Sequence, residues 1–168
     1  MIGAENITNG KIWDFLKEVL DPEVPVLNVV ELGVVRNVEL ADDQVLVTIT
    51  PTYTGCPAMK MIEENILEKL HEKGLENVKV KTVLVPAWTT EWLSEESKNK
   101  LKEYGIAPPD KVSLDQVLPF LSSEKKPIAC PRCGSTDTSM KSFFGSTACK
   151  ALYVCNDCKE PFDYFKCI

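Results

Sequence analysis

Four cysteines near the C-terminus have a spacing that suits a metal ion. They form two Cys-X-X-Cys pairs, Cys130–Cys133 and Cys155–Cys158, with 21 residues between the pairs. Two residues between cysteines let both sulfurs face one ion, and Gly134 permits the tight turn behind the first pair. The pattern predicts a closed tetrahedral site that holds structural zinc in a zinc ribbon. An iron site of the rubredoxin type, which has similar ligands, is the alternative.

The other cysteines in this region are expected to play a lesser part. The chain has seven cysteines in 168 residues. In a reducing compartment, this density indicates metal binding rather than a disulfide framework. Cys149 and Cys167 lie outside both pairs, and packing as small apolar residues is the favoured interpretation for each. The segment is too short for a hydrophobic core of its own, so the metal is expected to supply its folding energy.

Cys56 offers a second kind of chemistry. It follows a strand that alternates apolar and polar residues and a polar turn, and it precedes Pro57, which suits the first turn of a helix. A thiol at a helix N-terminus lies among backbone N–H groups without intrahelical partners, and such a position lowers its pKa. The sequence predicts a thiolate that attacks an electrophile or binds a metal. A buried, inert cysteine is the alternative.

Polar side chains accompany this thiol in the sequence. The turn before Cys56 carries the hydroxyls of Thr52 and Thr54, which can support a bound metal. Asp21 and Glu23 flank Pro22 in another turn. Turn chemistry with solvated acids is the favoured interpretation there, and a pair of carboxylates near the site is the alternative.

Two other functions compete with metal handling. In a thiol enzyme Cys56 would act as a nucleophile, but His71 is the only histidine of the chain. It lies about 22 Å further along the predicted helix, whereas a Cys/His pair needs hydrogen-bond reach. In a ribbon-based adaptor the ribbon would bind a protein or a nucleic acid, and the rest of the chain would be its scaffold.

The elements that must position these residues follow from hydrophobic periodicity and from helix-ending residues. Their order predicts an α+β fold, in which helices pack on one small sheet and a small zinc-ribbon domain with four cysteine ligands follows. We expect an α+β domain, a linker and the ribbon at 1–122, 123–129 and 130–168. The expected helices cover about 11–20, 57–71 and 94–104, and the expected strands cover 33–40, 45–50 and 78–85.

Charge and composition exclude some classes of function. The net charge is −6 and the pI is about 4.9, which argues against nucleic acid as the main partner. No apolar run approaches the length of a membrane span, and the N-terminal residues lack the apolar core of a signal peptide. We therefore expect a cytoplasmic protein without a membrane partner.

Two stretches resemble a known family. DPEVPVLNVVELGVVRNV and VTITPTYTGCPAMKMI resemble the domain of SufT-like iron–sulfur assembly and maturation factors. VPAWTTEWLSEESKNKLKEYGIAPP and the cysteine-rich tail resemble the PaaD branch of that family, the D subunits of the multicomponent phenylacetyl-CoA ring epoxidase. The resemblance runs from about residue 11 to the C-terminus. The hairpin turn Ala41–Gln44 lacks the glycine often found there, which affects the turn and not the site.

The resemblance implies a non-catalytic accessory protein of phenylacetate degradation. Such a protein helps to install or repair an iron or iron–sulfur centre in the epoxidase or reductase subunits. In the wider family the cysteine that matches Cys56 is the functional thiol, and acids matching Asp21 and Glu23 lie in the signature turn. Because one thiolate is too few to hold a cluster tightly, transient iron or iron–sulfur binding would need a homodimer or a client to supply further ligands.

Overall fold

The computed structural model describes residues 7–41, 44–109 and 127–166. The chain divides into two compact units, Met1–Trp88 and Thr89–Ile168. This division falls earlier than the linker expected at 123–129. That linker begins among residues that are not described, so the expected domain boundaries stay a prediction. Within the described residues, no helix is long and apolar enough to cross a membrane.

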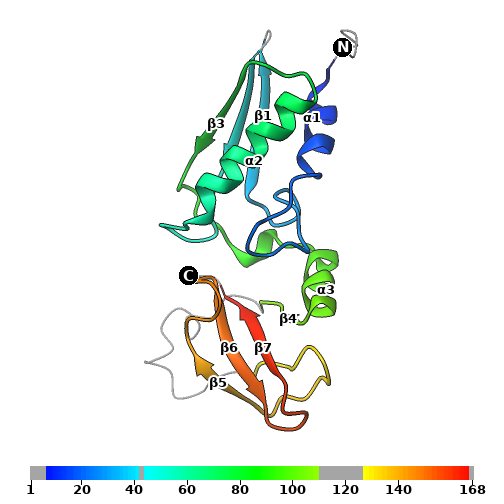
Figure 1. The fold of residues 1–168 in the computed structure, drawn as a ribbon, viewed down its shortest axis with the longest axis vertical. Helices are drawn as coiled ribbons and strands as arrows, with labels where there is room; N and C mark the ends of the chain where they lie inside the picture. Colours follow the sequence, from blue (N-terminus) through cyan, green and yellow to red (C-terminus); the bar gives the residue numbers. More distant parts are fainter. Residues whose placement is uncertain (1–6, 42–43, 110–126, 167–168) are drawn as a thin grey trace. The chain divides into compact units, whose positions relative to one another are not determined.

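The first unit is a three-stranded sheet with two helices on one face (Figure 1). β1 pairs with β2 in the expected antiparallel hairpin, whereas β2 pairs with β3 in parallel. α2 connects these two parallel strands. The strands are β1 (Val35–Ala41), β2 (Gln44–Ile49) and β3 (Val78–Thr82), and the helices are α1 (Asn9–Leu16) and α2 (Ala58–Glu72).

The core of this unit lies between the sheet and the helices. Val45, Val47 and Ile49 are fully buried on β2, as their alternation predicts. α2 presents Ile62, Ile66 and Leu70 to the same core, at the spacing of one helical face. Hydrophobic burial along these two elements therefore holds α2 against the sheet.

α1 ends four residues earlier than expected. It starts at Asn9, two residues before the expected start, and Thr8 caps it by accepting a hydrogen bond from the N–H of Lys11. After Leu16 the chain tightens into i→i−3 hydrogen bonds, and Leu20 then pairs with Asn28 in a short antiparallel bridge. The residue before a proline avoids helical geometry, which explains why the helix does not continue to Pro22.

The other face of the sheet is polar. The strand register sets Leu46 between Glu39 and Lys79, and Thr48 between Asn37 and Lys81. Lys79 and Lys81 are both exposed. β3 is an edge strand, and lysines on such a strand are a common protection against pairing with another chain.

The second unit joins a short helix to the ribbon. Its sheet has the order β4-β7-β6-β5, antiparallel except for β4, which pairs with β7 in parallel. Ser94 caps α3 and Gly105 ends it with a φ of 97°, so the helix keeps to its expected range of about 94–104. The elements are η1 (Thr90–Trp92), α3 (Glu95–Tyr104), β4 (Ile106–Ala107), β5 (Thr138–Ser142), β6 (Lys150–Cys155) and β7 (Pro161–Phe165).

The contact of β4 with β7 was not expected from the sequence. A strand of two residues carries no periodic signal, so Ile106 and Ala107 gave no sign that they extend the ribbon sheet. Both residues are buried. Ala107 belongs to the apolar cluster of the ribbon, together with Phe162 and Tyr164.

Replacement of Ile66 by alanine should destabilise the first unit. Ile66 is fully buried on α2, and the truncation leaves a cavity that should lower the free energy of unfolding by about 2–5 kcal/mol. Urea unfolding measures the change. Met61→Ala on the same helix, where the side chain is 52% exposed, should change it by no more than about 0.5 kcal/mol. Equal losses in both variants would contradict the assigned core.

Candidate metal centre and reactive thiol

The four cysteines of the two pairs gather in one place. The sulfurs of Cys130, Cys133, Cys155 and Cys158 all lie within 4.8 Å of one another. The Sγ atoms are 3.8 Å apart for Cys130 and Cys158 and 3.5 Å apart for Cys133 and Cys155. A tetrahedral zinc site with Zn–S bonds of about 2.3 Å has sulfurs about 3.8 Å apart. The cluster therefore has the ligands and the dimensions of such a site.

Two similar turns shape the cluster. In the first, the N–H of Gly134 donates to the carbonyl of Cys130 at 2.9 Å, and Gly134 has a φ of 77°. In the second, the N–H of Lys159 donates to the carbonyl of Cys155 at 3.0 Å, and Lys159 has a φ of 65°. The sequence shows the glycine of the first turn. It gives no sign that a lysine adopts the same left-handed geometry in the second.

Backbone N–H groups favour the thiolate at Cys155 but not at Cys158, where the N–H of Glu160 is outweighed by burial and neighbouring thiols, which raise the pKa to about 12. The N–H of Cys158, helped by that of Asp157 and opposed by burial, lowers the pKa of Cys155 to about 7. Thiolate is the form that binds a metal, so the turn prepares this ligand. Cys130 and Cys155 are buried, whereas Cys133 and Cys158 are exposed.

Polar side chains connect the two turns around the cluster. Ser135, which follows the first pair, donates a hydrogen bond to Asp157 within the second pair. Asn156 donates to Asp137 at 2.7 Å and to Ser139 at 3.0 Å. Such outer contacts orient the residues that bind the ion in metal sites. The sequence gives no sign of this network, because such polar residues are common in ordinary loops.

Cys149 is buried, as the sequence predicts, and its Sγ lies 3.1 Å from the hydroxyl of Thr147. It is not part of the metal cluster among the described residues. The expectation for Cys167 falls outside them. The ammonium of Lys166 lies over the rings of Phe143 and Phe144.

Cys56 lies directly before α2, as predicted. Its N–H donates to the carbonyl of Tyr53 at 3.3 Å, and its own carbonyl accepts from the N–H of Met59 at 3.3 Å. Pro57 supplies no side-chain cap to the helix. The thiol is partly exposed, in the segment that joins β2 to α2. An electrophile or a metal can therefore reach it from solvent.

The expected fall in the pKa of this thiol is wrong. Burial is the largest effect and raises the pKa of Cys56, and the charges of Glu23 and Asp21 raise it further. Hydrogen bonds from the N–H groups of Ala58 and Met59 lower it, but by less. The N–H groups at the helix N-terminus therefore lower the pKa as predicted, but burial and the two carboxylates raise it by more. A bound metal can still remove the proton, because a coordinating thiol is deprotonated by the ion.

The predicted turn chemistry of Asp21 is confirmed, although its carboxylate is not solvated. Oδ1 of Asp21 accepts from the N–H of Glu23 at 2.8 Å and from that of Val24 at 2.7 Å, and the side chain is only 5% exposed. Both acids are nevertheless close enough to influence Cys56 through their charge. The two interpretations of this turn, local capping and carboxylates near the site, are therefore compatible.

The structure gives less support to Thr52 and Thr54 as residues that act with Cys56. Thr52 is half-buried and Thr54 is exposed. Within the described part of the chain, no hydrogen bond joins either hydroxyl to Cys56. Thr50, in contrast, is buried and its hydroxyl has no hydrogen-bond partner among the described residues.

His71 lies in the last turn of α2, at the end opposite to Cys56. The separation along the helix is about 22 Å, too long for the proton transfer of a Cys/His pair. The structure thus brings together Cys56, Asp21 and Glu23, and it leaves the histidine apart.

Comparisons with known proteins identify the class of each unit. The description "Iron-sulfur cluster assembly protein" matches residues 9–85, and "PaaD zinc beta ribbon domain" matches residues 115–166. A crystal structure of the domain DUF59 from Bacillus anthracis has a TM-score of 0.52 and 28% identity, over 55% of this chain and 89% of that chain. The chain thus combines an iron–sulfur assembly domain with a zinc ribbon.

Two relatives narrow this class. A protein of Escherichia coli named as the putative D subunit of 1,2-phenylacetyl-CoA epoxidase is 46% identical over 94% of this chain and 92% of its own length. "Fe-S protein maturation auxiliary factor" of Porphyromonas gingivalis is 40% identical over 56% of this chain and 90% of its own length. The first likeness spans both units. The chain therefore belongs to the PaaD family, that of the D subunits of phenylacetyl-CoA epoxidase.

Loss of one ribbon cysteine should release the metal. Cys155→Ser removes a buried ligand, and metal binding to such sites is worth about 10–16 kcal/mol of folding free energy. We expect metal per chain to fall from near one to near zero, together with loss of structure in the ribbon, by elemental analysis and amide exchange. Cys149→Ser, which changes another buried cysteine, should keep the metal. Full metal content in Cys155→Ser would refute this ligand set.

The charge of Glu23 should control the reactivity of Cys56. Because this charge raises the pKa of the thiol, Glu23→Gln should move the midpoint of alkylation rate against pH to a lower value. Mass spectrometry of the Cys56 peptide after iodoacetamide treatment at a series of pH values measures the midpoint. Glu63→Gln, which removes a charge from α2 elsewhere, is the control. The proposed influence is absent if both variants match the wild type.

Proposed function

We propose that this protein is an accessory maturation factor of the multicomponent phenylacetyl-CoA epoxidase. It assists the assembly or repair of an iron or iron–sulfur centre in partner subunits, and Cys56 is the thiol that handles the metal. One observation carries this proposal: an accessible thiol at the start of α2, beside two acids, in an iron–sulfur assembly domain. The family membership supplies the epoxidase as the system that it serves.

The local chemistry suits brief rather than permanent binding. A cysteine with a raised pKa is mostly protonated at neutral pH, so a metal must displace the proton in order to bind. The proton competes for the sulfur, and this competition favours departure of the metal. Iron–sulfur clusters usually take four cysteines, and Cys56 is a single thiol. A client subunit, or the Cys56 of a second copy, supplies the remaining ligands. Asp21 and Glu23 add negative charge that attracts the cation.

The supporting residues have separate tasks in this proposal. Asp21 holds the turn that presents Glu23, while Thr52 and Thr54 provide oxygen atoms along the approach to the thiol. We assign zinc to Cys130, Cys133, Cys155 and Cys158, since their donor set and dimensions fit that ion. The zinc is structural and the protein has no catalysis of its own. We propose a cytoplasmic location, where reduced thiols are maintained.

The two competing functions, a thiol enzyme and an adaptor acting through the ribbon, depend on different residues. A thiol enzyme needs a base near Cys56, and His71 is at the far end of α2. An adaptor acting through the ribbon would depend on residues 127–168 and not on Cys56. Replacement of Cys56 therefore separates metal handling from the adaptor.

Cys56→Ser should prevent maturation of the epoxidase in cells while the protein keeps its fold. The hydroxyl of serine is too weak an acid to replace the thiolate as a metal ligand. We expect epoxidase activity, measured by loss of phenylacetyl-CoA in extracts, to fall to the level of a strain that lacks this protein. Cys149→Ser is the matched control and should keep activity. Normal activity in the Cys56→Ser strain would refute the role of this thiol.

A further inference from the structure

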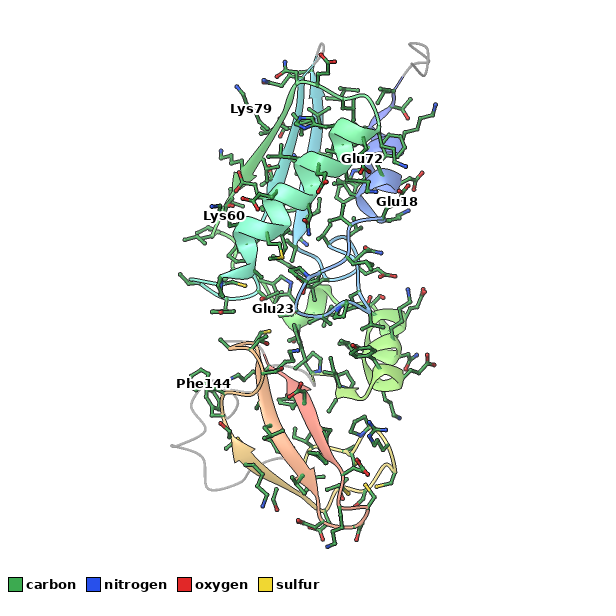
Figure 2. The ribbon with its side chains drawn as sticks, in the orientation of Figure 1. Glu18, Glu23, Lys60, Glu72, Lys79 and Phe144 are labelled. Atoms are coloured by element: carbon green, nitrogen blue, oxygen red, sulfur yellow. The ribbon has the colours of Figure 1, made fainter. Side chains whose placement is uncertain are left out.

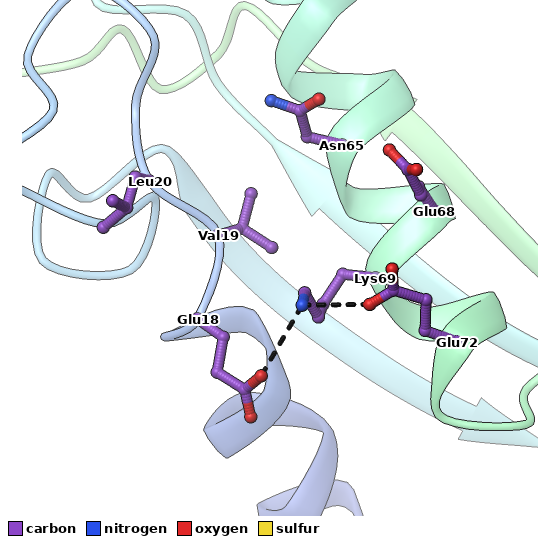
Figure 3. A pocket seen from close by; sticks show the side chains of 7 residues that line it. All are labelled: Glu18, Val19, Leu20, Asn65, Glu68, Lys69 and Glu72. Atoms are coloured by element: carbon purple, nitrogen blue, oxygen red, sulfur yellow. Dashed lines mark ion pairs between the residues drawn. The ribbon is translucent and has the colours of Figure 1, made fainter.

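An open groove lies between the end of α1 and the middle of α2 (Figure 3). Its volume is about 340 Å³. Glu18, Val19 and Leu20, which follow α1, form one wall, and the other wall is formed by four side chains of α2: Asn65, Glu68, Lys69 and Glu72. It lies within the first unit, on the helical side of the sheet (Figure 2).

The charges that face the groove are mainly negative. Three carboxylates line it, those of Glu18, Glu68 and Glu72, against the ammonium of Lys69. Lys69 lies 3.0 Å from Glu72 and 3.6 Å from Glu18. Lys73 also contacts Glu18, at 2.9 Å, and the pKa of that carboxyl is held below its usual range first by Lys73. Glu68 has no ion pair among the described residues.

The groove also has an apolar part. Leu20 is 53% exposed at its rim, next to the buried Val19. An exposed leucine beside carboxylates gives a surface that can make both apolar and ionic contacts. A cationic side chain fits the carboxylates, and an apolar neighbour of that cation fits Leu20.

One end of the groove, at Leu20, adjoins in the sequence the turn whose acids act on Cys56. Leu20 is followed directly by Asp21, whose charge and that of Glu23 act on Cys56. On the other wall, Asn65 lies nine residues after Cys56, about 14 Å along the helix. About four residues of extended chain span that distance. A peptide seated in the groove can therefore reach Cys56 without a change in the fold.

We infer that this groove docks a segment of the client protein in which arginine or lysine adjoins an apolar residue. The cation binds Glu68 and Glu72, the apolar side chain packs on Leu20, and the rest of the segment carries the metal-binding residues of the client toward Cys56. The inference rests on the proposed function and adds the chemistry of the partner to it. Its carrying observation is the groove itself, where three carboxylates lie beside the exposed side chain of Leu20.

Binding to the purified oxygenase and reductase subunits of the epoxidase tests the contact. Glu68→Gln removes a groove carboxylate without breaking an ion pair of the described residues. At low salt it should raise the dissociation constant about three-fold. Leu20→Ser should weaken it as well. Glu63→Gln, with the same charge change on the same helix but outside the groove, should bind like the wild type. If Glu68→Gln matches Glu63→Gln, or if no subunit binds the wild type, the inference is wrong.

A photo-crosslinking amino acid in place of Asn65, which lines the groove and is not one of the proposed contacts, identifies the occupant. We expect the crosslinked client peptide to contain arginine or lysine beside an apolar residue. A crosslink to an acidic peptide, or to a second copy of this chain, would overturn the inference. The same experiment with Cys56→Ser separates the two proposals, because docking should persist while maturation fails. If maturation depends on Cys56 but no crosslink forms in the groove, the proposed function stands and the docking site is refuted.

Discussion

The parallel pairing of β2 with β3 is the constraint on which the first unit depends. Parallel strands cannot be joined by a tight turn, so the chain must cross over the sheet between them. α2 is this crossover, and its buried face holds it against the strands. It must therefore begin at the carboxyl end of β2, where the turn that carries Cys56 lies. The groove beside α1 follows from the same crossover, since α2 forms one of its walls.

Features that depend on local spacing could be predicted from the sequence. The two Cys-X-X-Cys pairs, the hairpin of β1 and β2, and the start of α2 after Pro57 all arise from neighbouring residues or from one periodicity. The direction of the pKa of Cys56 could not, because burial outweighs the helix N-terminus and Glu23 acts from a distant part of the chain. The pairing of β4 with β7 was missed for a similar reason, since it joins residues that lie far apart in the sequence.

The same side chain meets opposite environments in the two units. Cys155 receives N–H groups from the turn that follows it, and these favour the charged thiolate. Cys56 receives similar N–H groups, but burial and two carboxylates favour the neutral thiol. The two thiols thus differ in their surroundings rather than in their chemical group.

The lysines of β3 bear on how the sheet would meet another copy of itself. Two copies of β3 placed edge to edge around Val80, in antiparallel orientation, would set Lys79 of one chain directly opposite Lys81 of the other. Like charges directly across such a pair are destabilising, and here the repulsion would occur twice by symmetry. Antiparallel growth of the sheet through the β3 edge is therefore opposed at its first step. Since both lysines are exposed and lie on the face away from the helices, this barrier to fibre formation makes no demand on the core.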